Sequence, residues 1–304
     1  MELHQLRYFL AVVKSGNFSR AAESCHVAQP SLSQQILKLE SELGEKLFER
    51  KSRQILLTSA GELLRLRAER ILHEIGEARR EIGDARGTPR GKVNLVALPT
   101  IAPYLLPKII RGFSRRCPAV ETVMHEETTD RALRLLEDNE LDLALVSLPI
   151  TDPRLEVRAL FSEELLLVLP RRHPLLRKRL LSDADLEPEK FIFMADTHCL
   201  GAQTLQFCYA RGFSPQISCR SAQMETVQSL VAAGAGISLV PAMARRHSSE
   251  VSYRSLGKPK PARTIALLWK KNRHLSRAAC ELRDYIIVTC ESRSKGRSAS
   301  GHGK

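Results

Sequence analysis

The feature that most constrains this chain is a long run from Ala60 to about Arg86, which holds no proline and repeats an apolar residue every three or four positions. The repeated positions are Leu64, Ala68, Ile71, Ile75, Ala78 and Ile82. This spacing predicts a heptad seam on one helix, which would be roughly 37 Å long for about 25 residues. A lone helix would leave that seam in water, so the pattern predicts that two copies of the chain pair along it.

The predicted helix divides the chain into parts. A sequence of 304 residues exceeds what one hydrophobic core usually serves, which predicts two or three folded units. Turn-forming residues 87–91 end the helix and predict a hinge. We expect a head over residues 1–59, a linker helix over 60–87 and a controlling domain over 88–291. The basic, serine- and glycine-rich residues 292–304 predict a disordered tail.

The head is predicted to be all-α before its last segment. Apolar residues at helical spacing indicate helices over residues 3–14 and 19–25, with Ser19 as the expected N-cap of the second. A third helix begins at Gln29-Pro30, because proline suits the first helical turn. Its apolar stripe consists of Leu32, Ile36, Leu39 and Leu43. That stripe is predicted to face the core.

Polar side chains gather at the front and outer face of this third helix, at Gln29, Pro30, Ser31, Ser33, Gln34 and Lys38. Amides and hydroxyls placed there can bond base edges in a major groove, and the free N–H groups can bond phosphates. The alternative is a solvated face on a small helical bundle. Residues 44–57 predict a hairpin wing whose Arg50, Lys51 and Arg53 suit phosphates or a minor groove.

Charge alone says less than this placement. The net charge of +13 and pI near 9.7 favour a polyanionic partner for the chain as a whole. Residues 1–58 hold eight Lys plus Arg against six Asp plus Glu, a surplus of only two. The position of the polar residues therefore carries the prediction of a DNA-reading head.

Three segments of the head match a known pattern: LRYFLAVVKSGNFSRAA, QPSLSQQILKLESELGEKLFER and LLTSAG. From Leu3 to Gly61 they resemble the winged helix-turn-helix of LysR-type transcriptional regulators. The resemblance implies binding to double-stranded promoter DNA, a homodimer through the linker helix that usually doubles to a homotetramer, and RNA polymerase as a further partner.

The controlling domain alternates strands and helices, with strands expected at 92–98, 121–126, 141–147, 191–194 and 236–240, and helices at 104–114 and 129–139. This βαβ alternation predicts parallel sheet in two α/β lobes. The LysR resemblance implies a two-lobed periplasmic-binding-protein-like (type 2) fold. It implies a first lobe of about 92–161 and 266–291 and a second of about 162–265, with the last helix at 276–288. Thr100 and Thr129 follow strand ends, where they can bind a ligand or merely cap a helix.

The segment Thr197 to Cys208 is the most informative part of this domain. Cys199 starts a predicted helix after strand 191–194, and a helix N-terminus stabilises a thiolate, which lowers its pKa. Beside donors such as Thr100, Thr129 and His198, this thiolate can attack peroxide. Cys208 lies nine residues on, about 13 Å along a helix, whereas a disulfide needs α-carbons within about 7 Å. A bond between the two cysteines would therefore require the helix to unwind.

The segments HCLGAQTLQFC, LPTIAPYLLPKII, HEETTD and VAAGAGISLVPA resemble the peroxide-sensing OxyR branch of the LysR family. One departure is Ala202, where that branch commonly carries an acidic residue, and it puts the strength of the peroxide response in doubt. Two alternatives remain open. The cysteines can be structural in a regulator that answers a metabolite bound between the lobes, or the chain can be a thiol peroxidase. The enzyme alternative leaves the DNA-reading features without purpose, so we expect no enzyme.

The remaining signals concern the protein's surroundings. Seven cysteines, an odd number in a chain without an apparent signal peptide, predict a reduced cytoplasmic protein. The most apolar run, residues 230–244, is interrupted by glycine and proline and is too short to cross a bilayer, so we expect no membrane contact. The histidines and cysteines lack metal-ligand spacing, and a lone glycine pair at 234 and 236 is no dinucleotide motif, so we expect no metal and no cofactor.

Overall fold

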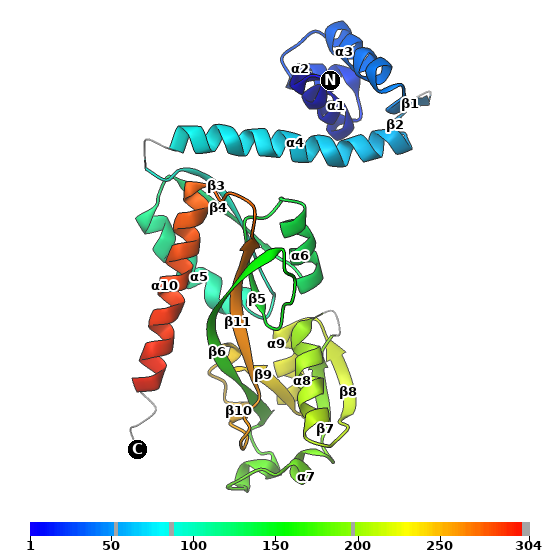
Figure 1. Ribbon diagram of the computed structural model, residues 1–304. Helices are drawn as coiled ribbons and strands as arrows, with labels where there is room; N and C mark the ends of the chain where they lie inside the picture. The colour runs from blue at the N-terminus through cyan, green and yellow to red at the C-terminus, as the bar shows by residue number, and fades with distance from the viewer. Residues whose placement is uncertain (52–53, 85–87, 196–197, 300–304) are drawn as a thin grey trace. The chain divides into compact units, whose positions relative to one another are not determined.

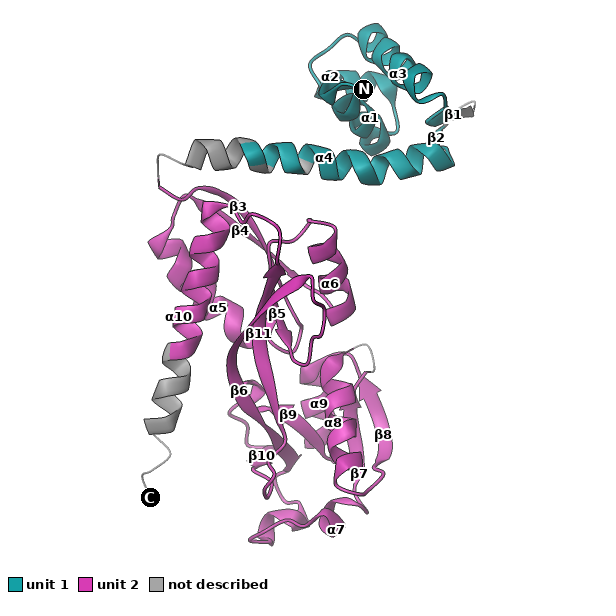
Figure 2. Cartoon of the chain, in the orientation of Figure 1, with its two compact units in different colours: residues 1–87 teal, residues 88–304 magenta. Residues whose placement is uncertain are grey.

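The computed structural model describes residues 1–51, 54–84, 88–195 and 198–299. The chain forms two compact units, Met1–Gly87 and Thr88–Lys304, coloured teal and magenta in Figure 2. Figure 1 labels their helices and strands. Arg53 lies outside the described residues, and of Arg50 and Lys51 only the backbone is described.

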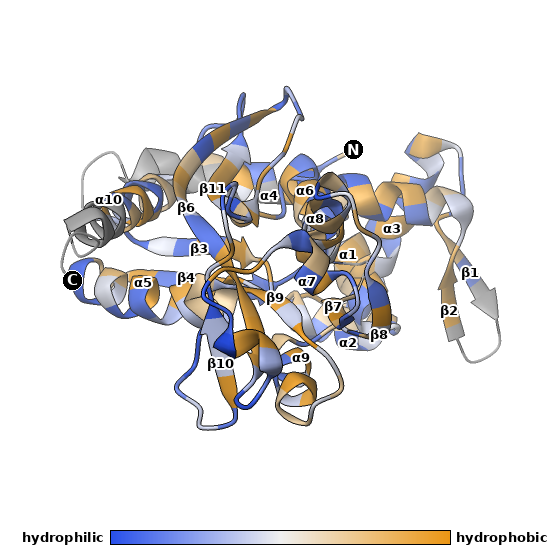
Figure 3. Cartoon of the chain, turned by 90° about the horizontal axis from the view of Figure 1, so that it is seen from below, coloured by the Kyte–Doolittle hydropathy of each residue, from blue (hydrophilic) through white to orange (hydrophobic). Residues whose placement is uncertain are grey.

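The first unit consists of four helices and a two-stranded hairpin. Its elements are α1 (Leu3–Ser15), α2 (Phe18–Ser24), α3 (Gln29–Leu43), β1 (Phe48–Lys51), β2 (Gln54–Leu57) and α4 (Ser59–Asp84). The predicted stripe of α3 is largely confirmed, since Leu32, Ile36 and Leu39 are buried while Leu43 is exposed. Figure 3 shows the alternation of hydrophilic and hydrophobic residues along α3. The ring of Phe48 joins the hairpin to this core, 5.2 Å from that of Phe9.

The N-cap of α2 is Asn17, so the expectation of Ser19 was wrong. The Asn17 side chain accepts hydrogen bonds from the backbone N–H groups of Ser19, at 2.8 Å, and Arg20, at 3.1 Å. The helix therefore starts two residues earlier than the serine suggested. Asparagine caps a helix as well as serine does, and the preceding Gly16, in the left-handed conformation at φ +62°, turns the chain so that Asn17 reaches the N–H groups.

The linker helix α4 uses part of its predicted seam within its own chain. Ala68 is fully buried in the core of the first unit, and Leu64 and Ile71 pack against the same core. Leu63 and Leu66 are instead exposed. A head of three short helices buries too little apolar surface alone, so the first turns of α4 complete its core.

The second unit begins with β3 (Gly91–Ala97), α5 (Ala102–Arg116), β4 (Val120–Glu126), α6 (Thr129–Glu137), β5 (Leu143–Ser147) and β6 (Leu155–Pro170). It continues with the short helices η1 (Pro174–Arg177) and α7 (Asp183–Leu186), then β7 (Lys190–Met194), α8 (Cys199–Ala210), β8 (Gln216–Ser221) and α9 (Met224–Ala232). The last elements are β9 (Ser238–Pro241), η2 (Ala242–Ala244), β10 (Val251–Arg254), β11 (Ala262–Lys270) and α10 (Arg277–Ala299). Its buried side chains form two separate clusters, one for each predicted lobe.

The sheet is mixed, so the expectation of parallel pairing holds only in part. Strand β3 pairs in parallel with β4 and β5, and β7 pairs in parallel with β8. The long strands β6 and β11 run antiparallel to each other. Strand β6 contributes Leu160 to the first core and Leu165, Leu167 and Leu169 to the second. These two strands thus join the lobes, and Figure 1 shows both passing from one lobe to the other.

The C-terminal helix is longer than the expected 276–288. Helix α10 reaches Ala299. Its first half is anchored by buried Ala278, Leu282 and Ile286, and extending an anchored helix costs little because each further residue adds a hydrogen bond. Residues 300–304 lie outside the described residues. None of the described helices is long and apolar enough to cross a membrane.

Candidate functional site

Helix α8 places Cys199 between the two lobes. The helix begins at Cys199 directly after β7, with His198 as its N-cap. Gly201 lets its first turn lie close to the end of β7, because a Cβ there would come within 2.5 Å of the Met194 carbonyl oxygen. Although Cys199 belongs to the second lobe by sequence, its side chain packs against the core cluster of the first.

Two threonine hydroxyls of the first lobe were predicted to line this site. Thr100 follows β3 and Thr129 begins α6 after β4, and the paired strands β3 and β4 bring these positions to one edge of the sheet. The Thr129 hydroxyl is buried and has no hydrogen-bond partner among the described residues. It lies where it would donate to a Cys199 thiolate. The structure therefore brings Thr129 and Cys199 together, as the sequence predicted.

Burial sets the resting state of Cys199. Loss of water raises the pKa of the Cys199 thiol. The Thr129 hydroxyl, the charge of Arg263 and the N–H groups of Leu200 and Cys199 itself act in the opposite direction but do not outweigh burial. The position of Cys199 at a helix N-terminus had predicted a lowered pKa for its thiol. The structure instead describes a thiol that is protonated at rest, with stabilising groups already placed for its thiolate.

His198 and Cys208 occupy the side of α8 that belongs to the second lobe. His198 is buried, and burial lowers its pKa, against a hydrogen bond to the Ala222 carbonyl that raises it. The imidazole is therefore neutral, and its bond directs the ring toward the segment between β8 and α9. Cys208 is fully buried in the second core, and burial raises the pKa of its thiol to about 12.

Cys199 and Cys208 are both free thiols on one uninterrupted helix. Nine residues of helix separate them by about 13 Å, as the sequence predicted. Ala202, the departure from the OxyR pattern, lies exposed on the same helix. A bond between the two sulfur atoms therefore requires α8 to lose its helical form between them.

A buried ion pair lies beside the site and was not predicted from the sequence. Arg263 on β11 and Glu163 on β6 have no solvent exposure, and Nη2 of the arginine lies 2.9 Å from Oε1 of the glutamate. Arg263 also donates from Nη1 to the Thr100 hydroxyl oxygen at 2.8 Å and from Nη2 to the Thr100 carbonyl at 2.9 Å. A lone arginine within the apolar run ARTIALLW was the signal that could have found it.

Gln203, also missed, connects α8 to the first lobe. Its side-chain amide donates to the Leu148 carbonyl at 2.7 Å and to the Ser147 hydroxyl at 3.1 Å, directly after β5. Gln203 lies one helical turn after Cys199, so both side chains are on the face of α8 toward the first lobe. The first turns of α8 are thereby fixed to that lobe.

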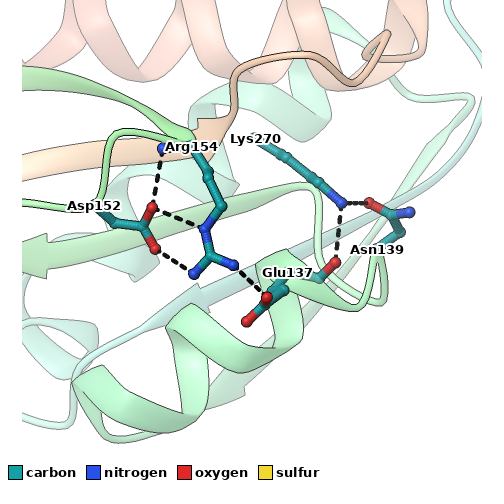
Figure 4. A network of polar contacts seen from close by, with 5 residues as sticks. All are labelled: Glu137, Asn139, Asp152, Arg154 and Lys270. Atoms are coloured by element: carbon teal, nitrogen blue, oxygen red, sulfur yellow. Dashed lines mark hydrogen bonds and ion pairs between the residues drawn. The ribbon is translucent and has the colours of Figure 1, made fainter.

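A polar network, shown in Figure 4, holds the C-terminal end of α6, whose first residue is Thr129. Lys270 of β11 donates to the Glu137 carbonyl and to the Asn139 side chain. Arg154 bonds the carboxylates of Glu137 and Asp152. Bonds from the Arg154 side chain, and then from its backbone N–H, lower the pKa of Asp152 to about 2. The network fixes α6 to the ends of β6 and β11, and with it the position of Thr129.

The head presents the predicted polar face of α3 to solvent. Gln29, Pro30, Ser31, Gln34 and Lys38 are exposed, and Ser33 is half-buried. Behind this face the amide of buried Gln5 donates to the Gln35 side chain at 3.1 Å, which fixes α3 on α1. The side chains predicted to contact DNA therefore project from a helix that is held rigidly from behind.

The start of the wing is fastened to α3 by a buried carboxylate. Glu40 accepts hydrogen bonds from the backbone N–H of Leu47, at 2.9 Å, and of Phe48, at 3.4 Å, and from the Lys46 ammonium. Gly61 allows α4 to approach this loop, since a Cβ would lie 2.2 Å from the Leu47 carbonyl oxygen. The hairpin that carries Arg50 and Lys51 is thus oriented by the helix next to it.

Comparison with known proteins decides the family. Residues 3–62 match the family described as bacterial regulatory helix-turn-helix protein, lysR family, and residues 86–290 match the LysR substrate binding domain. This chain belongs to the LysR family. LysR members are transcriptional regulators and not enzymes, which confirms the expectation for this chain. The two-lobed fold implied by the resemblance is likewise confirmed.

Individual relatives support the OxyR branch. The DNA-binding transcriptional dual regulator OxyR of Escherichia coli K12 is 38% identical over 274 residues, 89% of this chain and 90% of that protein. The hydrogen peroxide-inducible genes activator of Pectobacterium carotovorum is 37% identical over 290 residues, 94% of this chain and 96% of that protein. The resemblance to OxyR stated from the sequence is therefore confirmed.

Solved LysR-type structures share the whole architecture. Full-length OxyR from Pseudomonas aeruginosa aligns with a TM-score of 0.71 at 27% identity, over 95% of this chain and 94% of that one. CbnR in complex with its target DNA aligns with a TM-score of 0.69 at 25% identity, over 94% of this chain and 99% of that one. The order of head, linker helix and two lobes is thus that of full-length LysR regulators.

Proposed function

We propose that this LysR-family chain is a promoter-binding regulator that senses hydrogen peroxide by forming a reversible disulfide between Cys199 and Cys208. The observation that carries the proposal is the Cys199 thiol at the start of α8, packed on the first lobe beside the unpartnered, buried Thr129 hydroxyl. The names of the relatives point the same way, since two of them are described as OxyR or as a hydrogen peroxide-inducible activator.

The chemistry proceeds in two steps. The Cys199 thiolate attacks one peroxide oxygen and the O–O bond breaks. The other oxygen leaves as hydroxide, takes up a proton and becomes water, while the sulfur is oxidised by two electrons to a sulfenic acid. The Cys208 thiolate then attacks that sulfur, expels a second hydroxide that becomes water, and forms the disulfide. Thr100 and Thr129 hydroxyls and the α8 N–H groups would donate to the developing negative charge.

The second step links oxidation of Cys199 to a change in conformation. Cys208 is buried, and burial holds the pKa of its thiol far above neutral pH, so it reacts only after α8 unwinds and exposes it. Unwinding would also break the bonds from Gln203 to Ser147 and Leu148. The oxidised chain is then free to change the angle between its lobes, which provides a signal to the DNA-binding heads.

The test is to treat the purified, reduced protein with equimolar hydrogen peroxide and to map its disulfides by mass spectrometry. A Cys199–Cys208 link is expected, together with a stable sulfenic acid at Cys199 in a Cys208→Ser variant. Cys219→Ser, on β8, is the matched control and should leave the link intact. A protein that reacts without a Cys199–Cys208 link would overturn the disulfide mechanism.

A cavity favours a second candidate, a regulator that answers a small metabolite. Its volume is about 500 Å³, within the range of small-molecule sites. It is lined from the first lobe by Tyr104 and Glu126 and from the second by Gln223, Glu225 and Arg246, among others. One outcome would be that peroxide yields no Cys199–Cys208 link while one member of a library of small acids raises the melting temperature of the protein. In that case the metabolite hypothesis replaces peroxide sensing.

DNA recognition is assigned to residues 1–59, with Gln29, Pro30, Ser31, Ser33, Gln34 and Lys38 on α3 and Arg50 and Arg53 on the wing. Gln34→Ala should reduce the preference for promoter over random DNA, because a base contact is lost. Arg53→Ala should weaken binding to both DNAs and flatten its salt dependence, because a phosphate contact is lost. Gel-shift titrations at several salt concentrations measure both. Equal losses on both DNAs for Gln34→Ala would contradict direct base reading.

Assembly follows from the linker helix, residues 60–87. Two chains would pair along the part of α4 beyond Ile71 and along its exposed Leu63 and Leu66, and two dimers would form the tetramer usual in this family. The paired heads would read a near-palindromic site in the cytoplasm, where RNA polymerase is the partner that regulation acts on. Leu63→Glu with Leu66→Glu should lower the mass measured by sedimentation, whereas Arg67→Glu on the same helix is the control.

A further inference from the structure

Glu163 and Arg263 meet where the two lobes join. Their strands β6 and β11 are the segments that pass between the lobes, and both side chains are fully buried. Glu163 Oε1 accepts a hydrogen bond from Arg263 Nε at 2.9 Å, and Oε2 accepts one from the backbone N–H of Met243 in η2, also at 2.9 Å. The carboxylate thus uses both oxygens and is closed off from solvent.

The arginine on the other side fixes one threonine hydroxyl. Arg263 donates to Thr100 Oγ1 at 2.8 Å and to the Thr100 carbonyl at 2.9 Å. A guanidinium has no acceptor, so the single hydroxyl proton of Thr100 cannot point at Arg263. Thr100 is almost fully buried, so its hydroxyl proton must point away from Arg263 toward another group. The same guanidinium charge also acts on Cys199.

We propose that Glu163 is a positioning residue of the peroxide site: it holds Arg263 so that the Thr100 hydroxyl is oriented as a hydrogen-bond donor to peroxide bound beside Cys199. This inference rests on the proposed peroxide-sensing function. Glu163 touches neither peroxide nor Cys199, and acts through Arg263 and Thr100. Its second bond, from the Met243 N–H, fixes the same carboxylate to η2, the segment that follows β9.

A carboxylate is needed here for its charge as well as its shape. An uncompensated guanidinium in a buried site would turn toward the nearest anion. Without Glu163, Arg263 would leave Thr100 and turn toward Cys199, whose thiolate its charge stabilises. The thiolate would then be more populated but would face peroxide without an oriented donor. General thiol reactivity and peroxide reactivity are therefore expected to separate.

The test compares two rate constants of Cys199 in the full chain. One is for reaction with hydrogen peroxide and the other is for alkylation by iodoacetamide. Both are measured across a range of pH by mass spectrometry of the peptide that contains Cys199. In Glu163→Gln the ratio of peroxide rate to alkylation rate is expected to fall about tenfold or more, while the pH profile of alkylation moves to lower pH. A merely structural loosening would change both rates together and leave the ratio unchanged, which would overturn the proposal.

Three further variants complete the test. Thr100→Val should lower the ratio with little change in the alkylation profile, because only the oriented donor is lost. Glu163→Asp keeps the charge but shortens the side chain by one carbon, so it should also lower the ratio without moving the profile. Glu163→Asp provides the test if Glu163→Gln fails to fold. Glu164→Gln, next on β6 and bonded to Lys260, is the control and should behave as the wild type.

The outcomes separate the two proposals. If wild-type Cys199 does not react with peroxide, the proposed function fails, and this inference fails with it. Suppose that the wild type reacts and that every Glu163 variant that folds keeps the wild-type ratio of peroxide rate to alkylation rate. Only the positioning role of Glu163 is then overturned. A lowered ratio in Thr100→Val but not in Glu163→Asp would likewise overturn it, since Thr100 would then not depend on Glu163.

Discussion

Two thiols on one helix receive different chemistry from their surroundings. Cys199 is half-buried beside an unpartnered hydroxyl and feels the Arg263 charge, whereas Cys208 is buried among apolar side chains of the second core. Burial raises the pKa of both, but only at Cys199 do other side chains, Thr129 and Arg263, act in the opposite direction. The first thiol thus has groups beside it that stabilise its thiolate, whereas burial keeps the second protonated.

A similar dependence on local partners governs the caps of the head, and it gives a stability prediction. Asn17→Ala should lower the free energy of unfolding by about 1 kcal/mol, because α2 loses the side-chain acceptor for two N–H groups. Urea denaturation followed by circular dichroism measures the loss. Ser19→Ala is the matched control, since its hydroxyl is not the cap, and it should change stability by much less. A larger loss for Ser19→Ala would restore the assignment made from the sequence.

Helix α8 is the element on which the proposed switch depends. Its first turn is fixed to β7 through Gly201 and to the first lobe through Gln203. Its buried Thr204 hydroxyl bonds the carbonyls of Leu200 and Gly201 in the preceding turn, which competes with ordinary helical pairing. The segment between the two cysteines is therefore well attached at its start, and the attachment would be lost when the helix opens.

Gln203→Leu is expected to loosen α8 before any oxidant is present. The substitution removes the bonds to Ser147 and Leu148 without changing the length of the side chain much, so the backbone amides of α8 should exchange with deuterium severalfold faster. Gln206→Leu, exposed on the same helix, is the control and should exchange at the wild-type rate. Equal exchange in all three proteins would show that Gln203 does not hold the helix.

Elements that depend on neighbours in sequence could be predicted, and those that depend on distant partners could not. The stripe of α3 and the start of α8 follow from local spacing, and both were found. Strands β6 and β11 were not predicted. They cross from one core to the other, and they pair antiparallel where a βαβ pattern suggests parallel neighbours. The site divides in the same way. Cys199 and Thr129 were found from helix starts, whereas Glu163 and Arg263 are paired across 100 residues of sequence.

At the scale of the whole second unit, two cores share one pair of long strands. The ion pair of Glu163 and Arg263 lies on those strands, and Gln203 is a second polar connection from α8 to the first lobe. Loss of one helix would release one connection while the strands keep the lobes together, which suits a reversible change better than a general unfolding.

The burial that keeps the Cys208 thiol protonated also makes the stability of the second unit depend on pH in the alkaline range. Burial raises the pKa of this thiol from about 9 to about 12, so between these values the unfolded chain ionises while the folded chain stays protonated. The pKa is higher in the folded state, so the contribution to stability is complete below pH 9 and is lost as pH rises toward 12. The slope for one thiol approaches about 1.4 kcal/mol per pH unit.

Replacing Cys208 should therefore flatten the loss of stability above pH 9. Cys208→Ala is expected to be less stable than the wild type at pH 7, because it leaves a small cavity in the second core, yet to lose less stability on going to about pH 10. Tyr104, Cys117 and Cys280 also have a pKa raised by burial, so part of the alkaline loss should remain. Urea denaturation at both pH values measures it, with Cys219→Ala as the control that keeps the wild-type slope. Parallel losses in the wild type and Cys208→Ala would mean that the thiol ionises as readily in the folded protein as in the unfolded one, and that α8 already exposes it before peroxide arrives.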